Sequence, residues 1–210
     1  MRSVFECITC VENAIEKANL HTTTLTKKQL NVKGCSTENI RIFLNEIIAN
    51  DTNYLEIGIR FGSTFIPAIS NRDPKNKIAM DSFQHGGETD FHLNCASNNI
   101  KDFRLIKSDC FNLDADVKSS IQNIDVYFYD AEHTFEDQKK AFTYYYNNLA
   151  NVFIVAIDDY IYGEIVDGTQ AGIKETNLKI HKDWVLPAPT WWNGFYIAVC
   201  EKNPLLSNSD

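Results

Sequence analysis

The feature of this sequence that most constrains its fold is a regular alternation between residues 54 and 179. Short apolar runs alternate there with longer stretches of the length of a helix. Such alternation predicts a parallel sheet that is covered by helices on both faces. The apolar runs that read as strands are 54–57, 78–80, 103–106, 126–129 and 152–157, and the stretches that read as helices are 63–70, 88–97, 117–121, 134–149 and 169–179.

The N-terminal part of the chain is patterned less regularly. Ser36 and Thr37 are good helix N-caps, and apolar residues recur at helical spacing from there to Ile48, which predicts an amphipathic helix. Before them, residues 11–19 predict a short helix, and the polar, β-branched run 21–30 predicts a flexible arm or lid.

The C-terminal part follows another pattern. Residues 184–203, WVLPAPTWWNGFYIAVCEKN, contain two strand-like segments around a Pro-rich and Asn-Gly region, which predicts a closing antiparallel pair. No linker interrupts the alternating pattern. We therefore expect an N-terminal helical or lid segment at 1–50 and one domain at 51–210.

Composition narrows the class of protein. A chain of 210 residues with 44% hydrophobic and 23% charged residues is typical of one compact globular domain. The net charge of −8 argues against nucleic acid as a partner, since phosphate binding needs a basic face. No apolar run approaches the roughly 20 residues of a membrane helix, and the start does not read as a signal peptide. We expect a cytoplasmic protein without a membrane partner.

The first candidate site is a glycine loop after the first predicted strand, Tyr54-Leu55-Glu56-Ile57-Gly58-Ile59-Arg60-Phe61-Gly62-Ser63. Gly58 permits a sharp turn and a close approach to a ligand, and Gly62 permits close packing at the following helix start, whose free N–H groups attract anions. The spacing E-x-G-x-x-x-G is not the dinucleotide pattern G-x-G-x-x-G, which argues against a nicotinamide-dependent oxidoreductase.

Acidic residues end the next two strands. Asp81, followed by Ser82, lies roughly 20 residues after the glycine loop, where doubly wound folds place a carboxylate that accepts hydrogen bonds from ribose hydroxyls. Asp109, in Ser108-Asp109-Cys110-Phe111, takes the corresponding place after the third strand. For both residues the alternative interpretation is a turn or helix cap.

A second acidic group is more specific. Tyr129-Asp130-Ala131-Glu132-His133 ends one strand, and Ala156-Ile157-Asp158-Asp159-Tyr160 ends the next. Loops at the carboxyl ends of parallel strands converge on one crevice, so Asp130, Asp158 and Asp159 are expected to lie together. Clustered carboxylates repel one another unless a cation neutralises them, and oxygen ligands suit Mg²⁺ first, with Mn²⁺ or Ca²⁺ as alternatives. Capping and surface turns are the competing interpretation.

These motifs resemble a known family. The glycine loop resembles the S-adenosylmethionine (SAM) loop of class I methyltransferases. The stretch from Asp125 to Tyr160, with DVYFYDAEHTFEDQKKAF and VFIVAIDDY, resembles the metal-dependent O-methyltransferase group related to macrocin O-methyltransferase, which includes sugar O-methyltransferases. The resemblance covers about Thr52 to Val199. It implies a Rossmann-like class I methyltransferase fold, with a mostly parallel seven-stranded sheet and an antiparallel last strand.

The resemblance also implies residue roles. Asp109 would bind the adenine amino group, and the metal would be held by Asp130, Asp158 and Asp159. The base would be Glu132 or His133, of which we favour His133, since the reference pKa of imidazole, about 6.5, lies nearer neutrality than that of Glu. The residues expected to contact SAM are Glu56, Gly58, Gly62, Ser63, Asp81, Ser82, Asp109 and Asp130.

The expected reaction is methyl transfer to the hydroxyl of a small-molecule or glycan acceptor, favoured by the resemblance as a sugar such as a deoxyhexose. Aromatic residues near loop ends are expected to line the acceptor pocket or to pack the closing hairpin: His85, Tyr160, Tyr162, Trp184, Trp191 and Trp192. The alternatives are a catechol-type O-methyltransferase and a non-catalytic SAM-fold binding module. Both a homo-oligomer and a domain of a larger glycan-modifying enzyme fit the sequence.

Overall fold

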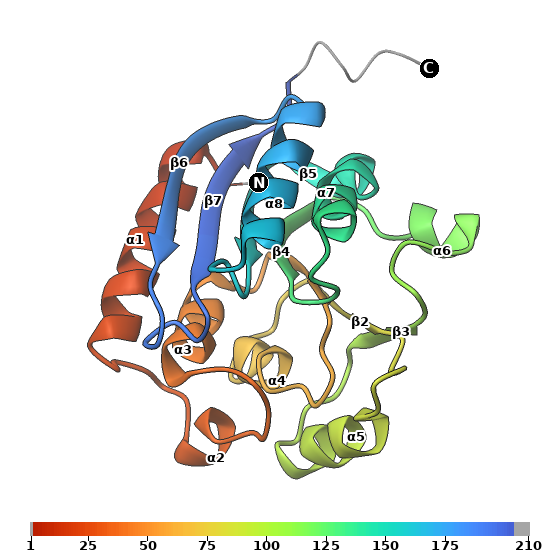
Figure 1. Cartoon of the computed structure of the whole chain (residues 1–210). Helices are drawn as coiled ribbons and strands as arrows, with labels where there is room; N and C mark the ends of the chain where they lie inside the picture. Colours follow the sequence, from red (N-terminus) through yellow and green to blue (C-terminus); the bar gives the residue numbers. More distant parts are fainter. Residues whose placement is uncertain (1, 204–210) are drawn as a thin grey trace.

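The computed structural model describes residues 2–203, which form one mixed sheet with helices on both faces (Figure 1). The strands are β1 (Asn53–Ile57), β2 (Asn76–Asp81), β3 (Arg104–Lys107), β4 (Ile124–Tyr129), β5 (Leu149–Ile157), β6 (Lys179–Leu186) and β7 (Phe195–Glu201). The helices are α1 (Val4–Asn19), α2 (Lys27–Leu30), α3 (Glu38–Ile47), α4 (Phe65–Ile69), α5 (Glu88–Ser97), α6 (Ala115–Ser119), α7 (Phe135–Thr143) and α8 (Gly163–Glu175), with a 3-10 turn at Tyr146–Asn148.

The strand order is β3-β2-β1-β4-β5-β7-β6. The pairs among β1 to β5 are parallel, and β7 is antiparallel to both β5 and β6. The predicted seven-stranded, mostly parallel sheet with an antiparallel last strand is therefore confirmed. Because the chain order reverses between β1 and β4, the loops after these strands diverge and leave a crevice at the carboxyl ends of the strands.

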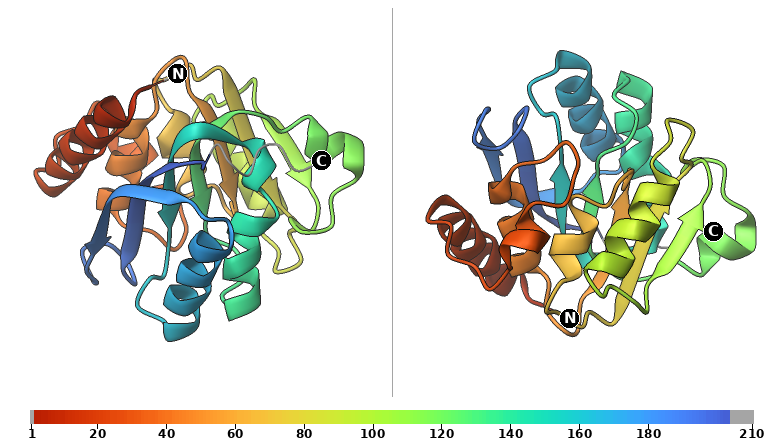
Figure 2. Two further views of the ribbon diagram at one scale, coloured as in Figure 1. Left: turned by 90° about the horizontal axis from the view of Figure 1, so that it is seen from above. Right: turned by 90° about the horizontal axis from the view of Figure 1, so that it is seen from below.

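Alternate residues of each central strand enter two separate cores. In β1, Tyr54 packs on the face that carries α1, α3, α4 and α5, whereas Leu55 and Ile57 pack on the face that carries α7 and α8. The two views in Figure 2 show these helix groups on opposite sides of the sheet. None of the helices within residues 2–203 is long and apolar enough to cross a bilayer.

The N-terminal segment differs from its expectation in two places. Helix α1 begins at Val4, seven residues before the predicted helix, because Ser3 and Glu6 form a capping box that the sequence interpretation missed. The expected flexible arm contains α2 and is packed against the domain: Leu25 and Leu30 are buried, and the side-chain amide of Asn71 donates to the carbonyl of Thr24. By contrast, α3 begins at Glu38, directly after the predicted cap Thr37.

One glycine joins the two central strands at their carboxyl ends. Gly58 has a φ of +93°, and a Cβ at this position would lie 1.7 Å from the carbonyl oxygen of Asp130. The amide of Asp130 in turn donates to the carbonyl of Ile57 at 2.9 Å. Glycine is therefore required at position 58 for two reasons. The sharp turn needs it, as the sequence predicts, and the backbone that follows β4 leaves no room for a Cβ.

A buried acid lies under the start of α4. The Glu56 carboxylate is fully buried and accepts hydrogen bonds from the hydroxyls of Tyr54 and Thr64. Loss of water around the charged form raises the pKa of Glu56 to about 7, although both hydrogen bonds act in the opposite direction. This acid joins β1 to the helix that follows the glycine loop.

Replacing Gly58 with Ala is expected to destabilise the protein by about 3 kcal/mol, because the new Cβ displaces the backbone after β4 and the positive φ is strained. The matched control is Gly163→Ala at the start of α8, where a Cβ would meet nothing within 4 Å. The control should change the free energy of unfolding by less than about 1 kcal/mol. Urea denaturation measures both, and equal losses would contradict the prediction.

The Glu56 carboxyl should also shape the pH dependence of stability. Its folded-state pKa of about 7 lies above its ordinary value of 4.5, so its stabilising contribution is complete below about pH 4.5 and is lost as the pH rises to about 7. Glu56→Gln is expected to remove this dependence, which amounts to about 3 kcal/mol. The variant should therefore gain stability relative to wild type between pH 5 and pH 8. Glu136→Gln, at an exposed position of α7, serves as the control and should follow wild type.

Candidate functional site

A cavity of about 760 Å³ opens at the carboxyl ends of the central strands, the edge at which the sequence places its candidate residues. The expected site residues that line the cavity are Gly58, Ser63, Asp81, Ser82, Asp109, Asp130, Glu132, His133 and Asp159. Three other expected residues do not border it. Glu56 lies beneath the glycine loop, Gly62 packs against Phe91, and Asp158 is buried behind Asp159.

The glycine loop is tied to the end of β2 through its backbone. The amide of Arg60 donates to Asp81 Oδ2 at 2.8 Å, and the amide of Phe83 donates to Asp81 Oδ1 at 2.6 Å. These bonds fix both oxygens of the Asp81 carboxylate at the cavity wall. Each oxygen keeps a further lone pair for a ligand hydroxyl.

Gly62 provides the close packing that the sequence predicts for it, although it does not line the cavity. Its φ is +78°, and a Cβ there would lie 2.8 Å from the ring of Phe91 in α5. The loop therefore packs closely against α5 where α4 is about to begin.

The β3 end of the cavity combines an acid with an aromatic ring. Asp109 Oδ1 accepts a hydrogen bond from the amide of Phe111 at 2.9 Å, so this acid also closes a local turn. The Phe111 ring is stacked on Tyr129, with centroids 6.2 Å apart, and the Lys140 ammonium lies 5.7 Å from the Phe111 ring centroid. This end thus offers a flat apolar surface beside a carboxylate.

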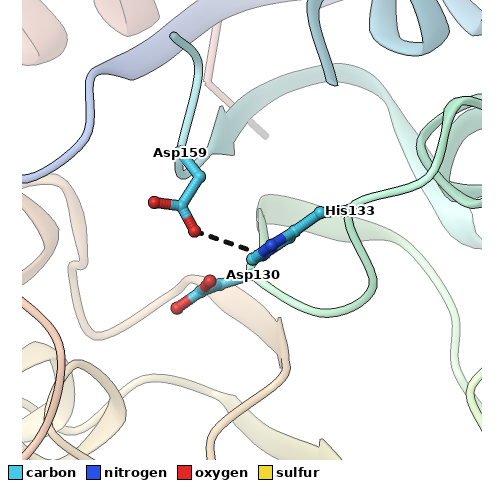
Figure 3. Close-up of side chains that lie close together, drawn as sticks. All are labelled: Asp130, His133 and Asp159. Carbon is cyan, nitrogen blue, oxygen red and sulfur yellow. Dashed lines mark ion pairs between the residues drawn. The ribbon is translucent and has the colours of Figure 1, made fainter. Parts of the chain in front are cut away.

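The third group lies after β4 and β5. Figure 3 shows the side chains of Asp130, His133 and Asp159 converging from two loops. One ligand atom from each of the three lies within 4.8 Å of the others, and His133 Nε2 is 3.2 Å from Asp159 Oδ2. Two carboxylates and an imidazole at this spacing can hold a divalent cation.

The expected set of three aspartates differs from this group at one position. Asp158 and Asp159 are consecutive, but Asp159 is the one that joins the group and lines the cavity. Asp158 Oδ1 accepts from the amide of Asp159 at 2.9 Å, while Asp158 Oδ2 is buried without a hydrogen-bond partner. His133, expected as a base, takes the third place in the cluster.

The electrostatics of this cluster favour a positive ligand. Burial, together with the charges of Asp158 and Asp159, holds the pKa of Asp130 well above its usual range. Burial and the charge of Asp159 do the same to the pKa of Asp158. A bound cation would reverse these shifts, because it stabilises the ionised carboxylates.

A second contact crosses the cavity from the loop after β2 to the loop after β4. Gln84 Nε2 donates to Glu132 Oε1 at 2.9 Å, and His85 Nε2 lies 3.5 Å from the same oxygen. The Glu132 side chain is half exposed, with its carboxylate held at the cavity wall. Sequence reasoning did not find Gln84, which belongs to no recognisable motif.

The loop before β7 supplies another residue that the sequence did not reveal. Asn193 Nδ2 donates to Asp159 Oδ1 at 2.7 Å, and the backbone of Asn193 and Gly194 bonds to the turn after β5. The Asn-Gly pair predicts a turn at this position. The pairing of β7 with β5, which brings this turn to Asp159, joins residues that are distant in sequence. Asn193 therefore orients the carboxylate of Asp159.

Two of the six expected aromatic residues line the cavity, and the other four do not. His85 and Trp192 line the cavity, and Cys35 reaches it from the N-terminal segment. Trp191 is instead buried beside Phe43 and Phe195, which fits the packing interpretation of that residue. The remaining three, Tyr160, Tyr162 and Trp184, are not among the residues that line the cavity.

Known structures share this architecture at low sequence identity. An O-methyltransferase from Bacillus cereus, solved with S-adenosylhomocysteine (SAH), matches with a TM-score of 0.63 and 13% identity, over 93% of this chain and 100% of the other. TYW2 of M. jannaschii, solved with AdoMet, matches with a TM-score of 0.57 and 12% identity, over 88% and 80%. The B. subtilis M1A22 tRNA methyltransferase TrmK matches with a TM-score of 0.54 and 12% identity, over 82% and 68%.

No family model matches the sequence, and no curated protein matches it either. The assignment of the fold therefore rests on the topology of the sheet and on the similarity to solved structures. The strand order, the antiparallel β7 and these similarities together show that the chain has the Rossmann-like fold of class I methyltransferases.

Proposed function

We propose that this protein is a SAM-dependent O-methyltransferase that methylates a sugar hydroxyl with the help of a divalent metal. The observation that carries the proposal is one cavity with two adjoining parts. The glycine loop and Asp81 form one part, and the cluster of Asp130, His133 and Asp159 forms the other. Support comes from the O-methyltransferase and the other SAM or SAH complexes that share the fold.

In this proposal the cofactor lies along the ends of β1, β2 and β3. Asp81 accepts hydrogen bonds from the ribose hydroxyls, and the glycine loop with Ser63 holds the methionine portion. Asp109 accepts from the adenine amino group, beside the flat face of Phe111. Ser82 Oγ accepts a hydrogen bond from the backbone amide of Gln84 at 3.3 Å, which helps to shape the loop after β2.

The metal would be held by Asp130 and Asp159, with either His133 or Asp158 as a further ligand. The buried, unpartnered Oδ2 of Asp158 and the raised pKa of Asp130 fit a site that takes a cation. Oxygen donors favour Mg²⁺, with Mn²⁺ or Ca²⁺ as alternatives. When bound, such an ion lowers the pKa of an acceptor hydroxyl and stabilises the developing alkoxide.

The residues of the chain perform the remaining steps. The imidazole of His133 receives the acceptor proton, and Asp159 Oδ2, 3.2 Å from His133 Nε2, stabilises the imidazolium that results. Glu132 is the alternative base. The acceptor oxygen then attacks the methyl carbon as the bond to sulfur breaks, which releases SAH. Most of the acceleration comes from holding oxygen, carbon and sulfur in line.

The acceptor is proposed as a sugar because the cavity near Asp159 combines an indole ring, Trp192, with amide groups from Gln84 and Asn193. Planar polar side chains beside an aromatic ring suit the hydroxyls and apolar faces of a sugar. A catechol shares the metal chemistry, and parallel assays with sugars and catechols separate the two. A binding module without activity would bind SAH and turn over neither.

Asp81→Asn is expected to weaken SAH binding by about 10- to 100-fold, because it removes the charge from one or two hydrogen bonds to ribose. Asp73→Asn is the control, since Asp73 is a largely exposed acid whose partner is Lys77. Titration calorimetry measures both variants. Absence of SAH and SAM binding in the wild type would refute the proposed function.

Metal binding tests the ligand set directly. Asp130→Asn and Asp159→Asn are each expected to weaken Mn²⁺ binding at least about tenfold, since each removes a charged ligand. If His133 is the third ligand, His133→Gln weakens binding equally and Asp158→Asn does not. If His133 is the base, His133→Gln retains Mn²⁺ affinity and loses methyl transfer. Mn²⁺ titration followed by electron paramagnetic resonance gives the affinities.

A further inference from the structure

Two cationic side chains lie over the ring of Phe61, a residue that lines the cavity. The Lys33 ammonium is 5.3 Å and the Arg60 guanidinium carbon 4.8 Å from the centroid of Phe61. Arg60 and Phe61 both line the cavity, and Lys33 comes from the N-terminal segment. Two parts of the chain that are distant in sequence thus bring positive charge to the same place.

Neither cation has an acidic partner within residues 2–203. The ring of Phe61 is the side-chain contact of both, and the structure records no ion pair for Lys33 or Arg60. This is unexpected in a chain with 28 acidic and 20 basic residues, where exposed cations readily find carboxylates. Two neighbouring unpaired cations repel each other, and an anion placed between them would remove that repulsion.

The rest of the cavity has the opposite charge. Its lining includes six carboxylates, from Asp81, Asp109, Asp130, Glu132, Asp137 and Asp159. Lys140 is the lysine of the lining, and it lies over Phe111. An anionic group on a ligand is therefore repelled from most of the wall and attracted to the rim at Phe61.

Both cations are carried by fixed backbone. The amide of Arg60 is bonded to Asp81, and its side chain packs against Gly87, where an added Cβ would lie 3.1 Å from Arg60 Cγ. Lys33 precedes Gly34, which packs so closely on Ser63 that a Cβ at Gly34 would lie 2.3 Å from the Ser63 side chain. The backbone that carries each cation is therefore packed against the domain, and both side chains are exposed.

We propose that Lys33 and Arg60 form a subsite for an oxyanion, a phosphate or carboxylate, carried by the methyl acceptor. The assignment to the acceptor rests on the proposed function and makes the acceptor an acidic or phosphorylated sugar. Phe61 gathers the two cations around its ring, and the oxyanion would lie beside that ring. The carboxylate of the cofactor is the other source of the same chemistry, and the experiment separates the two.

The test uses inorganic pyrophosphate as the probe, titrated by calorimetry in metal-free buffer of low ionic strength, with the protein alone and saturated with SAH. Wild type is expected to bind pyrophosphate in both states. Lys33→Gln and Arg60→Gln should each weaken binding about tenfold, and the double variant should abolish it. Lys75→Gln, which removes an exposed lysine at the opposite end of the sheet, should bind as wild type does.

Three results would overturn the proposal. They are no pyrophosphate binding by wild type, unchanged binding by the double variant, and loss of pyrophosphate binding when SAH is present, which would assign the subsite to the cofactor. The double variant should unfold at the temperature of the wild type, which reports that it is folded. If wild type fails to bind SAH, the proposed function fails, and the titration of the protein alone still decides whether the anion subsite exists.

Discussion

The contact between Gly58 and the carbonyl of Asp130 is the constraint on which the rest of the site depends. It requires a residue without a side chain at the end of β1, and it sets how closely the loops after β1 and β4 approach. Asp130 belongs to the proposed metal cluster, and Gly58 lies in the proposed cofactor loop. The two halves of the proposed chemistry are therefore joined by backbone that cannot shift independently.

Charge is distributed unevenly around this contact. Glu56 and Asp158 are buried acids and Asp130 is half-buried. Burial raises the pKa of all three, and the charges of Glu56 and Asp158 also act on Asp130. Without a cation, this region holds protons that free carboxyls release. The acidic interior and the cationic rim at Lys33 and Arg60 would orient a ligand that carries both hydroxyls and an anionic group.

Much of the fold could be predicted from local pattern, and the exceptions have physical causes. The helix 88–97 was predicted with its bounds as observed, whereas α8 begins at Gly163, six residues before the predicted start. Sequence propensity disfavours Gly168 inside that helix, but a Cβ there would lie 2.4 Å from the carbonyl of Phe135, so close packing on α7 requires the glycine.

The site was predictable where its residues directly follow strands. Asp81, Asp109, Asp130 and Asp159 all line the cavity for that reason. The orientation of Asp158 could not be predicted, because it depends on how one turn places two consecutive side chains. Gln84, Asn193 and Lys33 could not be predicted either, since their partners are brought close only by tertiary packing.

The position of β7 has a consequence for synthesis of the protein. This strand follows all the others in the chain, yet it lies inside the sheet, between β5 and β6. While the ribosome is still adding residues before Phe195, the edge of β5 that later pairs with β7 has no partner strand. The apolar side chains that later pack against β7 are also exposed. Unpaired edges of this kind readily associate with other chains. The nascent protein is thus most prone to aggregate just before its last strand emerges, and slow translation of that stretch would prolong the interval in which it needs a chaperone.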